Sequence, residues 1–135
     1  MGLFKRFFGK GPPSQALVAD FDATNEEKQQ IVGFLNSTSE KRIKNIIIYG
    51  NSGQLKYYKL LKYSILHDPD LDVKYAALKR IHLFSDHADT LTMLTELKNS
   101  SNTNYLEPYF SMALSKMGII SLKEFEEKMN NCKGI

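Results

Sequence analysis

The chain has 135 residues, of which 42% are hydrophobic and 24% charged, and its formal net charge is +3. These proportions exclude a disordered chain and predict a globular protein that is large enough to bury a core. No stretch approaches the roughly 18 apolar residues of a membrane-spanning helix, and the N-terminus lacks the pattern of a secretory signal. Because Cys132 is the only cysteine, no intrachain disulfide can form, and we expect a cytoplasmic protein.

Residues 1–23 are predicted to be a basic amphipathic tip followed by a linker. In the stretch MGLFKRFFGK, large apolar residues recur at helical spacing among lysines and an arginine; they are Leu3, Phe4, Phe7 and Phe8. The following GPPS sequence interrupts any helix. These four apolar residues are candidates for a weak, peripheral contact with an anionic membrane. The alternative is that they cap the end of the domain that follows.

Residues 24–135 are predicted to form a helical domain. Three capping-box patterns mark helix starts, at Thr24-x-x-Glu27, Ser37-x-x-Glu40 and Ser121-x-x-Glu124. The apolar periodicity between these and the turn signals predicts about seven helices. They are expected at residues 25–36, 39–50, 54–67, 71–84, 87–99, 105–117 and 122–132.

Three alternating aspartates, Asp68, Asp70 and Asp72, occur in the stretch HDPDLDVKYAALKRIHLF. A calcium loop of the EF-hand type that began at Asp68 would need glycine at Val73 and glutamate at Lys79. Asp70 can instead cap the following helix, and Asp72 can interact favourably with the positive end of its dipole. We therefore predict that the aspartates turn the chain, and we predict no metal site and no cofactor.

An internal repeat aligns Val73–Ile81 with Tyr109–Met117, at an offset of 36 residues. A period of this size, with two helices per unit, is typical of a helical solenoid. The first copy resembles the HEAT-repeat family, in which a turn containing aspartate leads into a second helix that opens with Val-Arg or Val-Lys. The residues that carry this resemblance are Asp70, Asp72, Val73, Lys74 and Ala77.

The resemblance to HEAT repeats covers roughly residues 54–117, without the proline that is common in the family's first helix. It implies an all-α fold, a short right-handed αα-superhelix, that serves as a binding scaffold rather than as an enzyme. It also implies that the second helix of each pair lines a concave surface.

Helical periodicity divides these second helices into a core side and a candidate binding side. The expected core residues are Ile43, Ile46, Ile47, Val73, Ala77, Ile81 and Phe84. The opposite side, basic and aromatic, consists of Lys41, Lys44, Asn45, Ile48, Tyr49, Tyr75, Lys79, His82 and Met112. On the preceding helix, Lys56, Lys59, Lys62 and Tyr63 are expected on the outer surface.

This candidate face predicts a non-catalytic module, of the adaptor or immunity-protein type, that binds a protein partner with an acidic surface. Tyrosine and methionine are enriched at protein interfaces, whereas lysine is more frequent at their rims. The alternative is a nucleic-acid or membrane-surface binder, because lysines also contact phosphates and aromatic rings stack on bases. A third interpretation is a solvated face on which lysine stems cover apolar surface.

Overall fold

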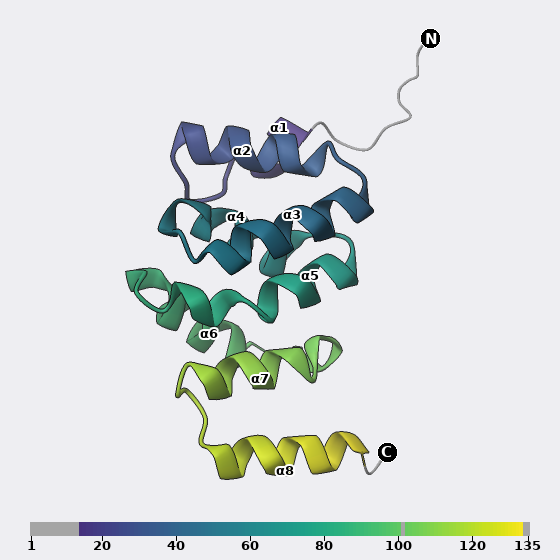
Figure 1. The fold of residues 1–135 in the computed structure, drawn as a ribbon, viewed down its shortest axis with the longest axis vertical. Coiled ribbons are helices and arrows are strands. Elements are labelled where there is room, and N and C mark those ends of the chain that lie inside the picture. The colour runs from purple at the N-terminus through teal and green to yellow at the C-terminus, as the bar shows by residue number, and fades with distance from the viewer. Residues whose placement is uncertain (1–13, 101, 134–135) are drawn as a thin grey trace. The chain divides into compact units, whose positions relative to one another are not determined.

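The computed structural model describes residues 14–100 and 102–133, and this part of the chain is all-α, with 74% helix and no strand (Figure 1). The chain divides into two compact units, residues 1–38 and 39–135. The apolar residues of the predicted tip, Leu3, Phe4, Phe7 and Phe8, lie outside the described residues. Within the described ranges, none of the helices has the length and apolar character that crossing a bilayer requires.

The first unit contains α1 (Ser14–Val18) and α2 (Asn25–Leu35). The predicted capping box opens α2: the Thr24 hydroxyl accepts from the Glu27 amide at 3.2 Å, and the Glu27 carboxylate accepts from the Thr24 amide at 2.8 Å. The ammonium of Lys28 donates to the carbonyl oxygen of Ala19 at 2.7 Å and so ties the segment after α1 to α2. Helix α1 was not predicted from the sequence, because five residues are too few to show a helical period.

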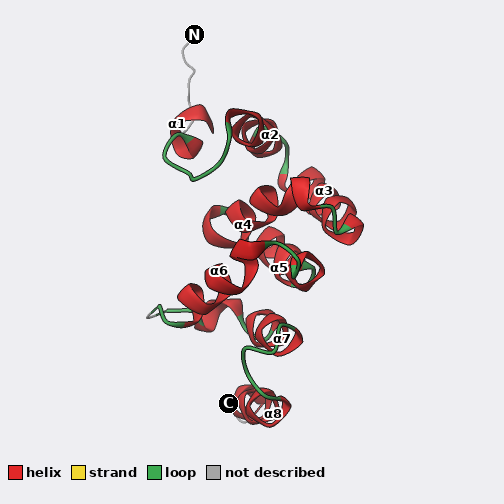
Figure 2. Ribbon diagram, turned by 90° about the vertical axis from the view of Figure 1, so that its left-hand side faces the viewer, coloured by secondary structure: helices red, strands yellow, loops and turns green. Residues whose placement is uncertain are grey.

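The second unit holds the predicted repeat. Its α-helices are α3 (Ser39–Ser52), α4 (Tyr58–His67), α5 (Leu71–Leu78), α6 (Ala88–Lys98), α7 (Tyr109–Lys116) and α8 (Leu122–Lys133). Short 3-10 turns lie at η1 (Leu55–Tyr57), η2 (Ile81–Phe84) and η3 (Asn104–Leu106). In Figure 2, α3, α5 and α7 follow one another in one layer, and α4 and α6 form a second layer beside it.

The core of the second unit lies between these two layers. Helix α4 is buried on most sides, and its neighbours supply large side chains that are almost completely buried. These side chains are Ile46, Tyr58, Leu60, Leu61, Ile65, Leu78, Ile81, Phe84, Leu94, Leu106 and Phe110. Because each such side chain contributes about 1.5–3 kcal/mol by leaving water, this cluster is the main source of stability.

The predicted outer surface of α4 is only partly correct. Lys56 is exposed, but Tyr63 is 4% exposed and belongs to the core. The ammonium of Lys62 is half-buried and forms an ion pair of 2.6 Å with Asp89 of α6. The same carboxylate accepts a hydrogen bond of 2.7 Å from the Tyr58 hydroxyl. Burial raises the pKa of Tyr58, and the hydrogen bond to this carboxylate raises it further. Helix α4 therefore packs against α6 through polar contacts that sequence spacing does not reveal.

The single helix predicted at residues 71–84 is in fact two elements, α5 and η2. Its expected core residues, Val73, Ala77, Ile81 and Phe84, are nevertheless all fully buried. The break lies at Arg80, whose φ of −119° is outside the helical range. The predicted helix at residues 105–117 is interrupted in the same way, by η3 and Pro108.

The aspartate turn joins α4 to α5, as predicted. Asp70 is the N-cap of α5, and its carboxylate accepts from the Asp72 amide at 2.8 Å. Asp68 accepts from the Asp70 amide at 2.8 Å and also holds Arg42 of α3, through hydrogen bonds of 3.0 and 3.2 Å. Only 1% of the surface of Asp68 is exposed to solvent. Asp68 therefore turns the chain and also anchors the turn to α3.

Lys74 stabilises the same turn from the other side. Its ammonium donates to the carbonyl oxygen of Ile65 at 2.8 Å, in the last turn of α4, where helix dipoles favour a positive charge. Burial lowers the pKa of Lys74, and the nearby charge of Asp68 opposes that shift. The Val-Lys pair that carries the resemblance to HEAT repeats thus has a structural role in closing one helix and opening the next.

Replacing Asp70 with alanine is expected to lower the free energy of unfolding by about 1 kcal/mol, because the amide of Asp72 loses its cap. Urea unfolding followed by circular dichroism would measure the loss. The control is Asp86→Ala, since Asp86 is exposed and lies outside a helix. Equal losses in the two variants would contradict the capping role.

Calcium or zinc should leave the melting temperature of the protein unchanged, because the aspartates turn the chain. A shift of several degrees would instead indicate that the aspartates bind a metal ion.

Candidate functional site

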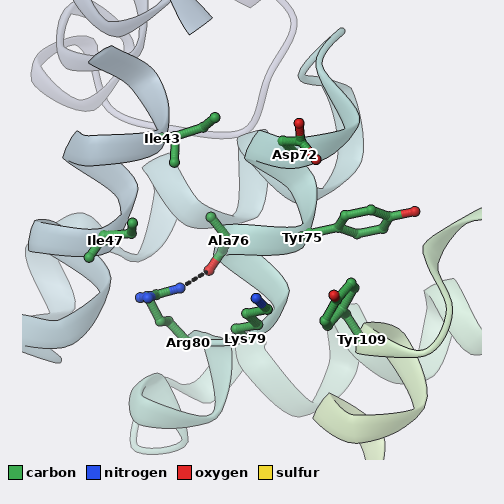
Figure 3. Close-up of a pocket in the computed structure, with 8 residues that line it drawn as sticks. All are labelled: Ile43, Ile47, Asp72, Tyr75, Ala76, Lys79, Arg80 and Tyr109. Atoms are coloured by element: carbon green, nitrogen blue, oxygen red, sulfur yellow. Dashed lines mark hydrogen bonds between the residues drawn. The ribbon is translucent and has the colours of Figure 1, made fainter. Parts of the chain in front are cut away.

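A hollow of about 320 Å³ opens between α3, α5 and α7 of the second unit (Figure 3). Ile43 and Ile47 come from α3, and Tyr109 comes from the start of α7. The remaining lining residues belong to α5 and the residues that follow it; they are Asp72, Tyr75, Ala76, Lys79 and Arg80. The hollow therefore spans three helices of one layer.

Two tyrosines and a lysine form the side of the hollow next to α7. The rings of Tyr75 and Tyr109 have their centroids 4.6 Å apart and are tilted by 49°. The Tyr75 hydroxyl donates to the carbonyl oxygen of Tyr105 at 2.9 Å, which fixes its ring. The ammonium of Lys79 lies 4.7 Å from the centroid of the Tyr109 ring, within the range of a cation–π contact. This side is thus ordered by contacts within the chain.

Arg80 forms the side of the hollow next to the end of α3. Its Nε donates to the side-chain oxygen of Asn51 at 3.0 Å, and one terminal nitrogen donates to the carbonyl oxygen of Ala76 at 2.9 Å. Burial lowers the pKa of Arg80, but a guanidinium remains charged at neutral pH. Gly50 makes this contact possible, since a Cβ at that position would lie 2.8 Å from Cδ of Arg80.

The apolar wall of the hollow corrects an expectation from the sequence. Ile43 and Ile47 were expected in the core with Ile46, but only Ile46 is fully buried. Ile43 and Ile47 are partly exposed and line the hollow opposite Ala76 (Figure 3). The buried residues of α3 are Arg42, Ile46 and Gly50, which are four residues apart, and Arg42 reaches inward to Asp68. Ile43 and Ile47 lie beside this buried stripe rather than on it. The apolar side chains of α3 are therefore available to a ligand.

The structure brings together only part of the predicted binding face. Tyr75 and Lys79 line the hollow, whereas Lys41, Lys44 and Ile48 are exposed on α3 outside it. Asn45 is half-buried and also lies outside it. Tyr49 stacks on Tyr57 of η1, with ring centroids 4.3 Å apart. Met112, on α7, is half-buried and does not line the hollow.

His82 lies in η2 rather than on the predicted helix face. Its Nδ1 is buried and has no hydrogen-bond partner among the described residues. Burial lowers the pKa of His82, and the nearby charge of Lys116 lowers it further. The second histidine of this region, His87, caps α6 through Nδ1 and stacks on Tyr58 at 3.9 Å. In the described ranges, no three His, Cys, Asp or Glu side chains are placed to hold a metal ion.

Sequence reasoning missed Arg80 and Tyr109 as lining residues. Both belong to the internal repeat, because Tyr109 aligns with Val73 and Arg80 with Lys116 at the same offset of 36 residues. The replacement of Val73 by a tyrosine at the matching position of the second copy was a usable signal. Ser111, which precedes Met112, is fully buried, and its hydroxyl donates to the Glu107 carboxylate at 2.6 Å.

The lining residues combine two cations, two aromatic rings and an aliphatic wall, with Asp72 at the start of α5. Such a surface can hold an anionic group and an apolar side chain at once. Comparison of the chain with protein-family models, with curated proteins and with solved structures gives no match. The resemblance to HEAT repeats therefore rests on the residues of this sequence alone.

Proposed function

We propose that the chain is a non-catalytic protein-binding module, of the adaptor or inhibitor type, that recognises an acidic partner through the layer formed by α3, α5 and α7. The hollow is the observation that supports this function. It joins Tyr75, Tyr109 and two cations to an aliphatic wall across three helices. Aromatic and arginine side chains dominate the energetics of protein interfaces.

The same proposal assigns the second unit to a short right-handed HEAT-like superhelix. Its support is the aspartate turn between α4 and α5, and the repeat that pairs α5 with α7. In such an array, α3, α5 and α7 are the second helices of their pairs, so the hollow would lie on the concave side.

Protein recognition is favoured over nucleic-acid binding by the contacts that the aromatic ring of Tyr109 already makes within the chain. Tyr109 already contacts both Tyr75 and the ammonium of Lys79. A base that stacked on Tyr109 would have to compete with these contacts, whereas a side chain can fill the hollow beside them.

A crosslinking experiment can find the partner. Benzoylphenylalanine would replace Ile47 in the hollow or, as the control, Leu91, which is 53% exposed on α6 in the other layer. A partner that crosslinks from position 47 and not from position 91 would be purified and titrated against the intact chain. We expect Tyr75→Ala to weaken its binding by at least about 1–2 kcal/mol and Leu91→Ala to leave it unchanged.

Equal affinities of the Tyr75→Ala and Leu91→Ala variants for this partner would refute the proposed function. So would a crosslinked partner that is nucleic acid, for which the logarithm of the affinity would fall linearly with the logarithm of the salt concentration. Binding to anionic vesicles that survives Tyr75→Ala would assign recognition to another surface.

A further inference from the structure

The Lys79 ammonium lies in the hollow without an anionic partner in the described part of the chain. The ion pairs shown there are Arg42–Asp68 and Lys62–Asp89, and neither borders the hollow. Lys79 contacts the ring of Tyr109, which orients its charge but does not neutralise it. Arg80 adds a second positive charge whose position is fixed by Asn51 and Ala76.

The hollow is electrically polarised along α5. Asp72 is the acidic residue of its lining and lies in the first turn of α5, whereas Lys79 and Arg80 follow its last turn (Figure 3). Seven residues of helix separate Asp72 from Lys79 by about 10 Å, which is about one Debye length at 0.1 M salt. The cationic end therefore attracts an anion that Asp72 repels only weakly.

The apolar wall lies beside this cationic end. Ile43 and Ile47 face Ala76 across the hollow, and all three present aliphatic surface (Figure 3). A volume of about 320 Å³ is at the lower end of the range for small-molecule pockets and is enough for one or two side chains.

We infer that the hollow binds a short acidic–aliphatic peptide segment, with a carboxylate at Lys79 and Arg80 and an aliphatic side chain on Ile43 and Ile47. This inference rests on the proposed function and names the chemistry of its partner. Nε and one terminal nitrogen of Arg80 are already bonded within the chain, so Arg80 offers an anion its remaining N–H groups beside the ammonium of Lys79. A carboxylate is the anion that the Asp and Glu side chains of a protein partner supply.

Short peptides test this inference by nuclear magnetic resonance. The probes are acetylated, amidated peptides that contain one leucine and one glutamate, separated by zero, one or two glycines, at millimolar concentration. Their matched controls carry glutamine in place of glutamate. We expect at least one glutamate peptide to shift the backbone amides of Ile47, Tyr75 and Lys79, and to bind about threefold to fivefold more tightly than its glutamine control.

Charge variants locate the carboxylate. Lys79→Met is expected to remove the preference for glutamate and to leave the glutamine peptide unaffected. Lys98→Met, which removes an equal charge from the exposed end of α6, should change neither affinity. Lys79→Gln provides a second variant if the methionine variant does not give a dispersed spectrum.

Three results would overturn the inference: equal binding of the glutamate and glutamine peptides, an equal effect of Lys79→Met on both, or shifts confined to residues outside the hollow. A peptide with phosphoserine that binds more than about tenfold tighter than its glutamate counterpart would also overturn it, in favour of a phosphate site. If the peptides fail but a crosslinked protein still needs Tyr75, the proposed function stands without this inference. If the peptides bind but no protein crosslinks at position 47, the proposed function fails instead.

Discussion

Replacing Asp68 with alanine is expected to lower the free energy of unfolding by about 3–5 kcal/mol, because it leaves the Arg42 guanidinium buried without this carboxylate. The Arg42 side chain is 10% exposed and that of Asp68 is fully buried, so the ion pair is largely shielded from water. The Asp70 amide loses its acceptor as well. Urea unfolding followed by circular dichroism measures the change.

The neighbouring Asp72→Ala variant is the control for the loss of Asp68, since Asp72 is exposed and belongs to the same turn. Its expected loss is about 0.3–1 kcal/mol, from the helix dipole alone. If Asp68→Ala does not fold, the double variant Arg42→Met, Asp68→Leu should recover the helical spectrum, because an apolar pair can replace a buried ion pair. A loss below about 1 kcal/mol for Asp68→Ala would show that the pair does not anchor the turn.

Replacing Phe84 with alanine is expected to cost about 3–5 kcal/mol, since it leaves a cavity in the centre of the second unit. Phe84 is completely buried, and its ring centroid lies 6.4 Å from that of Tyr58 on α4. Its ring therefore joins η2 to the other layer. The same urea titration at 25 °C would measure this loss.

The preceding residue offers a matched control for Phe84. Leu83 is 44% exposed, so Leu83→Ala should cost less than about 1 kcal/mol. If Phe84→Ala is too unstable to study, Phe84→Leu should still fold, with a smaller loss than Phe84→Ala because it removes fewer buried carbons. Similar losses at positions 83 and 84 would contradict the assignment of Phe84 to the core.

The sequence predicted the helical class and most helix positions because their signals are local. The capping box at Thr24, the cap at Asp70 and the 3.6-residue period all lie within one or two turns of chain. The same locality explains why Tyr75 and Lys79 could be placed on one face. These two residues are four apart, and both precede the break at Arg80.

The remaining features depend on contacts between residues that are distant in sequence. Arg42 and Asp68 are separated by 26 residues, and no local pattern shows that a charged residue of α3 points inward. Arg42 belongs to the buried stripe of α3 with Ile46 and Gly50, whereas Ile43 and Ile47 are partly exposed and form the apolar wall of the hollow. The helix break at Arg80 likewise lies where its side chain meets Gly50 and Asn51 of α3. Propensity alone cannot anticipate either result, since tertiary contacts decide both.

Gly50 determines how closely two helices approach without itself lining the hollow between them. A single methyl group there would lie 2.8 Å from Cδ and 3.0 Å from Cβ of Arg80, so the arginine or the end of α3 would have to move. Gly50→Ala is therefore expected to displace the side chain of Arg80, and so to change the shape of the hollow, from a position that does not line it. A residue that makes no contact with a ligand can therefore alter which ligands the hollow accepts, because it sets the position of a side chain that does.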